Sequence, residues 1–283
     1  MTDIQRTILE IFKEFDRLCN KYNIPYYAIG GTCIGAIRHN GFIPWDDDMD
    51  VAIPIEEFDR FISIAKEELP PYYKVFSSSE VQHYRYLFIK IIDTRTTFIE
   101  KLEYEYEDSY KGIFLDIMPI SGIPENLLYN WLFRLKQSYY YVMNNTVRYP
   151  LEYVLRGNNV NKAIWKYAYF ISKVSAKKPF YYYTDKWMKM LRDNPFNKSK
   201  LSGYVWNNRL GRLVFNTEVF GHPVRIPFED TTILCPENSD SYLSAQFGDY
   251  MKLPPVDQQV SVHPGIVSIE KPYKEFIGKL KEI

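Results

Sequence analysis

A run of aspartates separated by single residues is the part of this chain best suited to chemistry. Residues 44–51 read Pro-Trp-Asp-Asp-Asp-Met-Asp-Val, so Asp46, Asp48 and Asp50 alternate. In a β-strand alternate side chains point to the same face, and the spacing predicts three carboxylates on one face. Aligned carboxylates repel unless a cation lies between them, and hard oxygen ligands select Mg²⁺, Mn²⁺ or Ca²⁺. We therefore expect a divalent metal site, and these residues alone leave Mg²⁺, Mn²⁺ and Ca²⁺ open.

Two adjacent glycines, Gly30 and Gly31, lie shortly before the aspartates, and a short helix is predicted after them, with Thr32 as its cap. Glycine lets the backbone approach an anion closely, and the start of a helix offers unpaired N–H groups and a positive dipole end. We expect Gly30, Gly31 and Thr32 to contact phosphate. Metal and phosphate are thus predicted to meet at one place.

Asp116 interrupts an apolar run over residues 113–118. A buried carboxylate is costly without a partner, so this aspartate needs either a cation or a salt bridge. Both readings stay open from the residues alone.

Three basic side chains are candidate phosphate ligands. Arg38 suits bidentate contact with phosphate oxygens, or it satisfies carbonyls at the end of its helix, and His39 beside it has the same two options. Lys90 lies in the apolar run over residues 87–92 and either meets a diphosphate or points to solvent from an edge strand.

A calcium-binding loop is the sharpest competing interpretation of the aspartates. With Asp46 as its first position, Glu57 falls at the twelfth, as such a loop prefers. However, Val51 occupies the position where glycine supplies a sharp turn, and Pro54 follows at the ninth position. We disfavour the calcium loop for this reason. The chain also lacks the G-x-x-x-x-G-K-[ST], G-x-S-x-G and G-x-G-x-x-G motifs, which argues against a P-loop, a serine hydrolase and a dinucleotide fold.

The elements that position these residues follow from hydrophobic periodicity. Apolar residues at helical spacing predict helices over 3–22 and 55–69, and a long helical segment over 125–187. Short apolar runs bounded by Gly, Pro and Asn predict strands. These strands cover residues 25–29, 49–53, 72–76, 86–92 and 113–118. The predicted class is α+β with a helical middle, packed into one body.

Composition bounds the partners and the compartment. Lys+Arg and Asp+Glu both number 35, so the chain lacks the positive field needed to coat a nucleic acid. No apolar stretch reaches the length of a membrane-spanning helix, and the start of the chain does not read as a secretory signal. The 3 cysteines are scattered, which favours a reducing compartment. We expect a cytoplasmic protein that binds no nucleic acid.

Taken together, these stretches resemble the signature of the LicD family of phosphotransferases. The residues that carry the resemblance are Gly30-Gly31, Gly35-Ala36, Arg38-His39, Gly41-Phe42-Ile43-Pro44-Trp45-Asp46-Asp47-Asp48, Asp50, Leu115-Asp116-Ile117-Met118-Pro119, Gly122-Ile123-Pro124, Tyr242-Leu243 and Phe247-Gly248-Asp249-Tyr250-Met251-Lys252-Leu253-Pro254-Pro255. Phe247 departs from the tyrosine usual in the family. The segment over 125–200 matches only in general character.

The resemblance implies a nucleotidyltransferase-like mixed β-sheet flanked by helices. It also implies a catalytic core over residues 1–124, a helical segment over 125–200 and a C-terminal segment over 201–283 that packs back on the core. In such a fold Asp48 and Asp50 would hold Mg²⁺, with Mn²⁺ as its substitute, and Asp116 would be a third carboxylate and Asp46 a further ligand.

The implied reaction moves a phospho-alcohol, by preference phosphocholine, from a CDP-linked donor to a glycan hydroxyl or a lipid-linked precursor, with release of CMP. Three alternatives remain: another CDP-linked polyol as donor, transfer of a nucleotide on the same fold, and an inactive relative that binds glycan or nucleotide.

The aromatic residues allow two interpretations. A choline cation is recognised by aromatic faces, which residues 139–141 and 181–183, Trp45, Trp131 and Trp165 would supply, but aromatics at helical spacing more often pack in a core. The basic aromatic segment over 162–178 is typical either of a helix at the inner face of an anionic membrane or of a core helix with a solvated lysine edge. An acidic stretch over 103–108 reads as a solvated hairpin, and His263 as a weaker site candidate.

Overall fold

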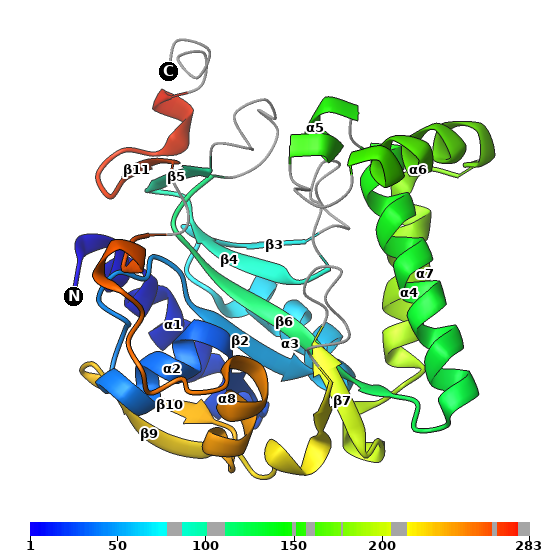
Figure 1. Cartoon of the computed structure of the whole chain (residues 1–283). Helices are drawn as coiled ribbons and strands as arrows, with labels where there is room; N and C mark the ends of the chain where they lie inside the picture. The colour runs from blue at the N-terminus through cyan, green and yellow to red at the C-terminus, as the bar shows by residue number, and fades with distance from the viewer. Residues whose placement is uncertain are drawn as a thin grey trace.

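The computed structural model of the chain describes residues 1–77, 87–100, 111–148, 151–156, 162–176, 178–204, 214–261 and 265–276. A mixed β-sheet runs through the molecule, helices pack around it, and an arm of further helices stands at one side (Figure 1). The predicted α+β class is therefore confirmed. The predicted boundaries between the three segments remain a prediction. The acidic stretch over 103–108 and His263 lie outside the described residues.

The large sheet has the strand order β1-β2-β6-β4-β3, with β7 on β6 and β8 on β7. The pair β2 and β6 is parallel, and the other pairs are antiparallel. All ten residues of β6 are buried, as expected of a strand covered on both faces. The strands are β1 (Tyr27–Ala28), β2 (Asp50–Pro54), β3 (Tyr73–Phe76), β4 (Ile89–Asp93), β6 (Phe114–Ile123), β7 (Leu201–Tyr204) and β8 (Phe215–Asn216).

Two smaller antiparallel pairs accompany the large sheet. The strands β9 (Val224–Phe228) and β10 (Thr231–Cys235) form a hairpin next to α2 (Gly30–His39). The strand β5 (Thr97–Glu100) pairs with β11 (Gly265–Ser268), which brings the C-terminal part of the chain back to the core (Figure 1).

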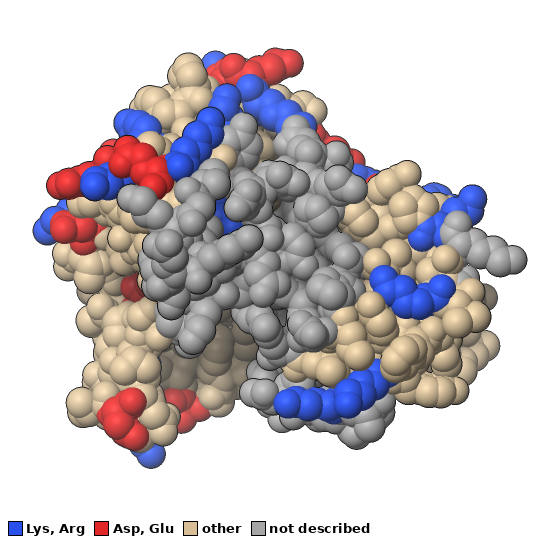
Figure 2. Space-filling view, turned by 90° about the horizontal axis from the view of Figure 1, so that it is seen from above, with Lys and Arg blue, Asp and Glu red and all other residues tan. Residues whose placement is uncertain are grey.

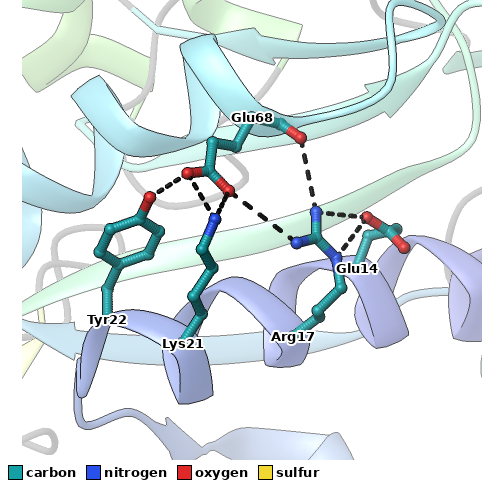
Figure 3. Close-up of polar contacts among 5 residues, drawn as sticks. All are labelled: Glu14, Arg17, Lys21, Tyr22 and Glu68. Atoms are coloured by element: carbon teal, nitrogen blue, oxygen red, sulfur yellow. Dashed lines mark hydrogen bonds and ion pairs between the residues drawn. The ribbon is translucent and has the colours of Figure 1, made fainter.

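The helices α1 (Asp3–Tyr22) and α3 (Ile55–Glu68) pack against strands of the large sheet. Helix α1 begins where Thr2 and Gln5 form a capping box, and its apolar side chains are buried at helical spacing. At the far end of the pair, Glu68 accepts hydrogen bonds from Lys21, at 2.6 Å from Nζ to Oε2, and from Tyr22 (Figure 3). Exposed contacts of this kind contribute about 1 kcal/mol or less, so the apolar interface does most to orient these helices.

The arm consists of α4 (Leu127–Arg148), α5 (Leu151–Arg156), α6 (Lys162–Ser175) and α7 (Phe180–Arg192), at the right of Figure 1. Helices α4 and α7 lie side by side and α6 packs on α4. Buried side chains on α4 and α7, among them Phe133, Trp187 and Leu191, join the same hydrophobic core as the sheet. Within the described residues no helix combines the length and the hydropathy needed to span a bilayer.

Several local predictions differ from the structure. Helix α2 begins at Gly30, with Ile29 as its N-cap, rather than after a cap at Thr32. Strand β2 begins at Asp50, so Asp46 and Asp48 precede it and the three aspartates do not share one strand. Strand β4 lies between β6 and β3 and Lys90 is buried, so the alternative in which Lys90 points to solvent from an edge strand is excluded. The arrangement of non-local strands decides each of the last two points.

Candidate active site

Three charged residues form a row across neighbouring strands of the large sheet. In the parallel pair β2–β6, Asp50 lies opposite Asp116, and in the antiparallel pair β4–β6, Lys90 lies opposite the same Asp116. Residues directly opposite each other place their side chains on the same face of a sheet. Two carboxylates that are 66 positions apart in the sequence therefore meet, with an ammonium group on the far side of the second.

The carboxyl group of Asp50 lies in an electrostatically unfavourable place. Its Oδ1 atom is enclosed and has no hydrogen-bond partner among the described residues. Burial raises the pKa of Asp50 well above its usual value, and the charge of Asp48 adds to this. Asp116 and Asp46 act in the same direction, while Lys90 lowers that pKa. Asp50 as a whole residue is half-buried, but a carboxyl group enclosed at Oδ1 beside three further carboxylates needs a cation to stay ionised.

Lys90 is the cation that the fold itself supplies. Its side chain is buried, with Nζ 3.3 Å from Oδ1 of Asp116 and 3.1 Å from the centre of the Phe114 ring. The ammonium group therefore faces a carboxylate and an aromatic face, both of which favour positive charge. Neither option considered for Lys90 included this pairing with Asp116, and its contact with a diphosphate stays a prediction.

The acidic loop that precedes β2 is held by helix α1. Gln5 is buried, and its Nε2 donates hydrogen bonds to the carbonyls of Ile43, at 3.1 Å, and Asp46, at 2.9 Å. The carboxylates of Asp46, Asp47 and Asp48 each bring one oxygen to within 4.8 Å of the others. The loop is thus fixed in place while its carboxylates gather near Asp50.

Asp47 is a member of this cluster that the alternation of Asp46, Asp48 and Asp50 leaves out. It is buried, and its Oδ2 accepts a hydrogen bond from Ser261. Alternation in a strand would place Asp47 on the opposite face, but the loop geometry places its oxygen with the others. The sequence signal for Asp47 is the unbroken Asp-Asp-Asp run, which predicts this clustering only if the run is assigned to a loop instead of a strand.

The paired glycines make room for the carboxylates. Gly30 has φ +56°, a conformation that glycine adopts without strain, and a Cβ atom there would lie 3.6 Å from Asp50 Oδ2. A Cβ atom at Gly31 would lie only 2.7 Å from Asp46 Oδ2. The hydroxyl of Thr32 accepts a hydrogen bond from the Asp50 N–H at 2.8 Å. The bend and the first turn of α2 therefore position both aspartates.

Two tyrosines from the C-terminal part of the chain fasten this bend. The N–H of Gly30 donates to the hydroxyl of Tyr242 on α8 (Ser239–Phe247) at 2.9 Å. The Tyr242 hydroxyl lies 2.9 Å from that of Tyr204, which donates to Oε1 of Gln246 at 2.7 Å. The Gly30 N–H is thus already paired, and contact with phosphate through it would require replacing Tyr242. The family resemblance includes Tyr242, but sequence reasoning assigned it no role.

Arg38 and His39, at the end of α2, contact each other and the C-terminal segment. Nη1 of Arg38 donates to the carbonyl of Tyr250 at 2.5 Å, and its Nε donates to Nε2 of His39 at 3.0 Å. Burial, and then the charge of Arg38, lower the pKa of His39, which favours the neutral imidazole that accepts this bond. Trp45 packs edge-on against His39, with ring centres 6.4 Å apart. The structure thus gives Arg38 a structural contact, and its role as a phosphate ligand stays a prediction.

The aromatic residues proposed as a choline cage lie mostly in the arm. Tyr139 packs edge-on against Tyr183, and Tyr141 lies between Trp165 and Trp187 at ring distances of 5.9 Å and 6.2 Å. These contacts join α4, α6 and α7, so packing accounts for part of the set. Other members are exposed, namely Trp131, Tyr139, Tyr181 and Tyr182. Of the proposed cage residues, Trp45 lies in the acidic loop itself.

This chain is similar to a known protein family and to a named transferase. The family described as "LicD/FKTN/FKRP, nucleotidyltransferase domain" matches residues 23–163. The lipopolysaccharide cholinephosphotransferase LicD of Haemophilus influenzae is 29% identical over 271 residues, which cover 92% of this chain and 94% of that protein. Residues 23–163 belong to the LicD family.

Two further relatives match a short part of the chain. Uncharacterized proteins of Rickettsia typhi and Rickettsia prowazekii are 40% and 41% identical over 58 and 51 residues, which is 19% of each protein. The LicD match over 23–163 contains the Asp50–Asp116–Lys90 row and the acidic loop, whereas Tyr204, Tyr242 and Tyr250 lie beyond it. The match to the Haemophilus influenzae transferase covers 92% of this chain and so extends beyond the family match.

The carboxylates fit a divalent metal on the evidence of their own chemistry. The enclosed Oδ1 of Asp50 has no hydrogen-bond partner among the described residues, and the neighbouring groups that raise the pKa of Asp50 are all carboxylates. Carboxylate oxygens are the ligands that Mg²⁺ and Mn²⁺ prefer. Among the described residues, the carboxylate oxygens close enough to share one ion are those of Asp46, Asp47 and Asp48. Asp50 and Asp116 lie opposite each other on the adjacent strands, and their role as further ligands stays a prediction.

Gly31→Ala tests whether the paired glycines position Asp46. The added Cβ would lie 2.7 Å from Asp46 Oδ2, so the carboxylate has to move. Because misplacement of a catalytic group by about 1 Å costs up to 10²-fold, we expect activity to fall by about 10- to 100-fold with the fold retained. The measurement is kcat/KM for the transfer reaction, with circular dichroism as the check on folding.

The control for Gly31→Ala is a double-mutant cycle with Asp46→Ala. If the alanine acts by displacing Asp46, it has little further effect once that carboxylate is gone. Two fully additive effects would show that Gly31 acts on something other than Asp46.

Proposed function

We propose that this LicD-family chain is a Mg²⁺-dependent transferase that moves a phospho-alcohol, by preference phosphocholine, from a CDP-linked donor to a hydroxyl of a cell-surface glycan or its lipid-linked precursor. CMP is the second product. The lipopolysaccharide cholinephosphotransferase that the chain resembles over 92% of its length supports the phosphocholine group and the glycan acceptor. Mn²⁺ is the expected substitute metal.

The observation that carries the proposal is the register of β2 against β6, which places Asp50 opposite Asp116. Phosphoryl transfer needs positioning and neutralisation of charge more than a covalent intermediate. Two carboxylates on adjacent strands, with Asp46 and Asp48 close enough to raise the pKa of Asp50, provide the anionic cradle that a metal–diphosphate complex requires. Repulsion between enclosed carboxylates lowers the stability of the fold, so a site with only a structural role would not be expected to contain them.

Each side chain has a distinct task in the reaction. Asp46, Asp48, Asp50 and Asp116 would hold Mg²⁺, which supplies charge neutralisation at the donor diphosphate and lowers the pKa of the acceptor hydroxyl. Lys90 orients the Asp116 carboxylate and limits the excess negative charge of the row. Gly30 and Gly31 let the carboxylates of Asp50 and Asp46 approach the first turn of α2 closely, and the positive end of that helix would favour the donor phosphates nearby.

The bond changes are those of a single displacement. The oxygen of the acceptor hydroxyl bonds to the phosphorus distal to cytidine and gives up its proton, while the bond from that phosphorus to the bridging oxygen breaks. The bridging oxygen leaves with CMP. In nucleotidyl transfer on the same fold, the acceptor would instead keep the nucleotide, so the identity of the leaving product distinguishes the two reactions.

Incubation of the purified protein with Mg²⁺, a glycan extract and a panel of CDP-alcohols tests the proposal, with chromatographic detection of CMP and pyrophosphate. We expect CMP release with CDP-choline that depends on both metal and glycan. Release of CMP with a CDP-polyol but not with CDP-choline would change the donor and keep the reaction. Pyrophosphate as the product would overturn the reaction in favour of nucleotidyl transfer, and binding of CDP-alcohols without turnover would indicate an inactive relative.

A further inference from the structure

Helix α6 exposes apolar side chains on its outward face. Trp165 and Ser172 are buried against the rest of the arm, whereas the opposite side carries a stripe at i, i+3, i+4 and i+7 spacing. The stripe consists of Tyr167, 71% exposed, Phe170, 61%, Ile171, 45%, and Val174, 88%. A surface helix of a water-soluble domain normally has polar residues on its outward face, whereas the outward face of α6 is apolar.

Helix α4 repeats the pattern in its first half. Phe133 and Gln137 are buried, and large apolar residues occupy the other side of the helix. That outward stripe consists of Leu128, Trp131, Leu132, Leu135 and Tyr139, each between 38% and 62% exposed. Isolated exposed apolar residues need no explanation, but two stripes on contacting helices mark an interaction surface.

The charges around these stripes are almost all positive. Residues 127–178 contain nine Lys and Arg and one Asp or Glu, although the whole chain is neutral. On α6 the exposed Lys162, Lys166 and Lys173 fall at a spacing that places them along one flank of the stripe. Figure 2 shows lysine and arginine atoms scattered over the surface on its right-hand side, where the arm lies.

We propose that the arm, through the outward stripes of α6 and α4, docks on the surface of an anionic phospholipid membrane. A helix that presents aromatic and aliphatic residues flanked by lysines lies in the interface, with its apolar side chains among the acyl chains and its ammonium groups at the phosphates. Long lysine side chains reach the headgroup level while their stems remain on apolar surface.

Charge distinguishes this occupant from a second copy of the chain. Two identical arms placed face to face would bring the exposed Lys162, Lys166 and Lys173 of one α6 near those of the other, and like charges across an interface are unfavourable. An anionic lipid surface complements both the apolar and the basic features. The inference does not depend on the proposed reaction, because it concerns a surface outside the carboxylate row.

Flotation of the purified full chain with phosphatidylglycerol-containing vesicles is the test, with pure phosphatidylcholine vesicles beside it. We expect flotation with the anionic vesicles that weakens in high salt. Two variants should each lower the bound fraction by about tenfold or more: Lys162→Glu with Lys166→Glu, and Phe170→Ser with Val174→Ser. Leu132→Ser with Leu135→Ser tests the α4 stripe in the same way.

Lys198→Glu with Lys271→Glu is the matched control, because both lysines are exposed and lie outside the arm. It changes net charge as much as the α6 pair and should leave flotation unchanged. Absence of flotation with anionic vesicles would overturn the proposal, as would equal binding to phosphatidylcholine or equal loss in the control. A different result would assign the stripes to a second copy of the chain: light scattering shows a dimer, the variant Phe170→Ser with Val174→Ser is a monomer, and no flotation is seen.

Discussion

Asp116→Asn is expected to remove nearly all transfer activity while the protein stays folded. Substitution of a residue that merely orients a metal ligand costs about 10- to 100-fold, so loss of a ligand carboxylate should lower kcat/KM by at least about 100-fold. The asparagine side chain has almost the same shape, but it cannot supply the negative charge opposite Asp50. The measurement is CMP release at saturating and limiting Mg²⁺, together with a thermal melt.

Asp93→Asn is the matched control for this variant. Asp93 lies on the neighbouring strand β4 and is buried like Asp116, but its carboxylate pairs with Arg95 at 2.7 Å instead of facing other carboxylates. We expect the control to lose stability and to keep its activity per folded molecule. If Asp116→Asn keeps activity within about tenfold of the wild type, the Asp50–Asp116 pair does not hold the catalytic metal.

Asp50→Asn is expected to stabilise the protein in the presence of EDTA, although it should abolish activity. The Oδ1 atom of Asp50 is enclosed and has no hydrogen-bond partner among the described residues, and the surrounding carboxylates repel its charge. Relief of such a buried charge contributes about 1–3 kcal/mol, and each kcal/mol shifts the melting temperature by about 2–4 °C in a chain of this size. Differential scanning calorimetry with EDTA and with Mg²⁺ measures both states.

The effect of Asp50→Asn should depend on pH in a defined direction. Because burial and the neighbouring carboxylates raise the pKa of Asp50 in the folded protein, the unfolded chain gives up this proton at lower pH than the folded one does. The metal-free wild type should therefore lose stability as pH rises above the ordinary aspartate pKa of about 3.9, until the folded pKa is passed. The variant lacks this loss, so its advantage grows with pH.

Added Mg²⁺ should reverse the order of the two proteins. We expect it to bind the ionised carboxylates of the wild type and to stabilise that protein by an amount that grows with the logarithm of the Mg²⁺ concentration above the dissociation constant, whereas the variant should respond weakly. Asp93→Asn again serves as the control, since loss of its ion pair with Arg95 should lower the melting temperature under both conditions. Two results together would contradict the metal site: a melting temperature of the wild type that does not change with Mg²⁺, and an Asp50→Asn variant that melts at a lower temperature than the wild type in EDTA.

Local features of the fold were predictable because they depend on neighbours in sequence. The helix predicted over 3–22 is observed as Asp3–Tyr22, since apolar periodicity and the Thr2 cap are local signals. The strand predicted over 113–118 is observed as Phe114–Ile123, and a continuous apolar run is the expected pattern for a strand buried on both faces. The chemical character of the aspartate-rich loop and of the paired glycines was likewise readable from residue types.

Non-local features were not predictable in the same way. Lys90 has an apolar sequence context that fits either an edge strand or an interior one, and only the order β6-β4-β3 makes it a buried partner of Asp116. The hydrogen bond from Gly30 to Tyr242 spans 212 positions, and no local pattern encodes it. Asp47 joined the carboxylates because Gln5 holds the loop by its backbone, which breaks the alternation assumed for a strand.

By itself the amino-acid sequence determined the α+β class, the ends of the first helix and the presence of aspartates and glycines suited to metal and phosphate. Those properties follow from side-chain type and from spacing along the chain. The tertiary structure decided that Asp50 faces Asp116 across two parallel strands, that Lys90 balances them, and that the apolar stripes of the arm point outward. Register and burial arise from packing between distant segments, so they exist only once the chain has folded.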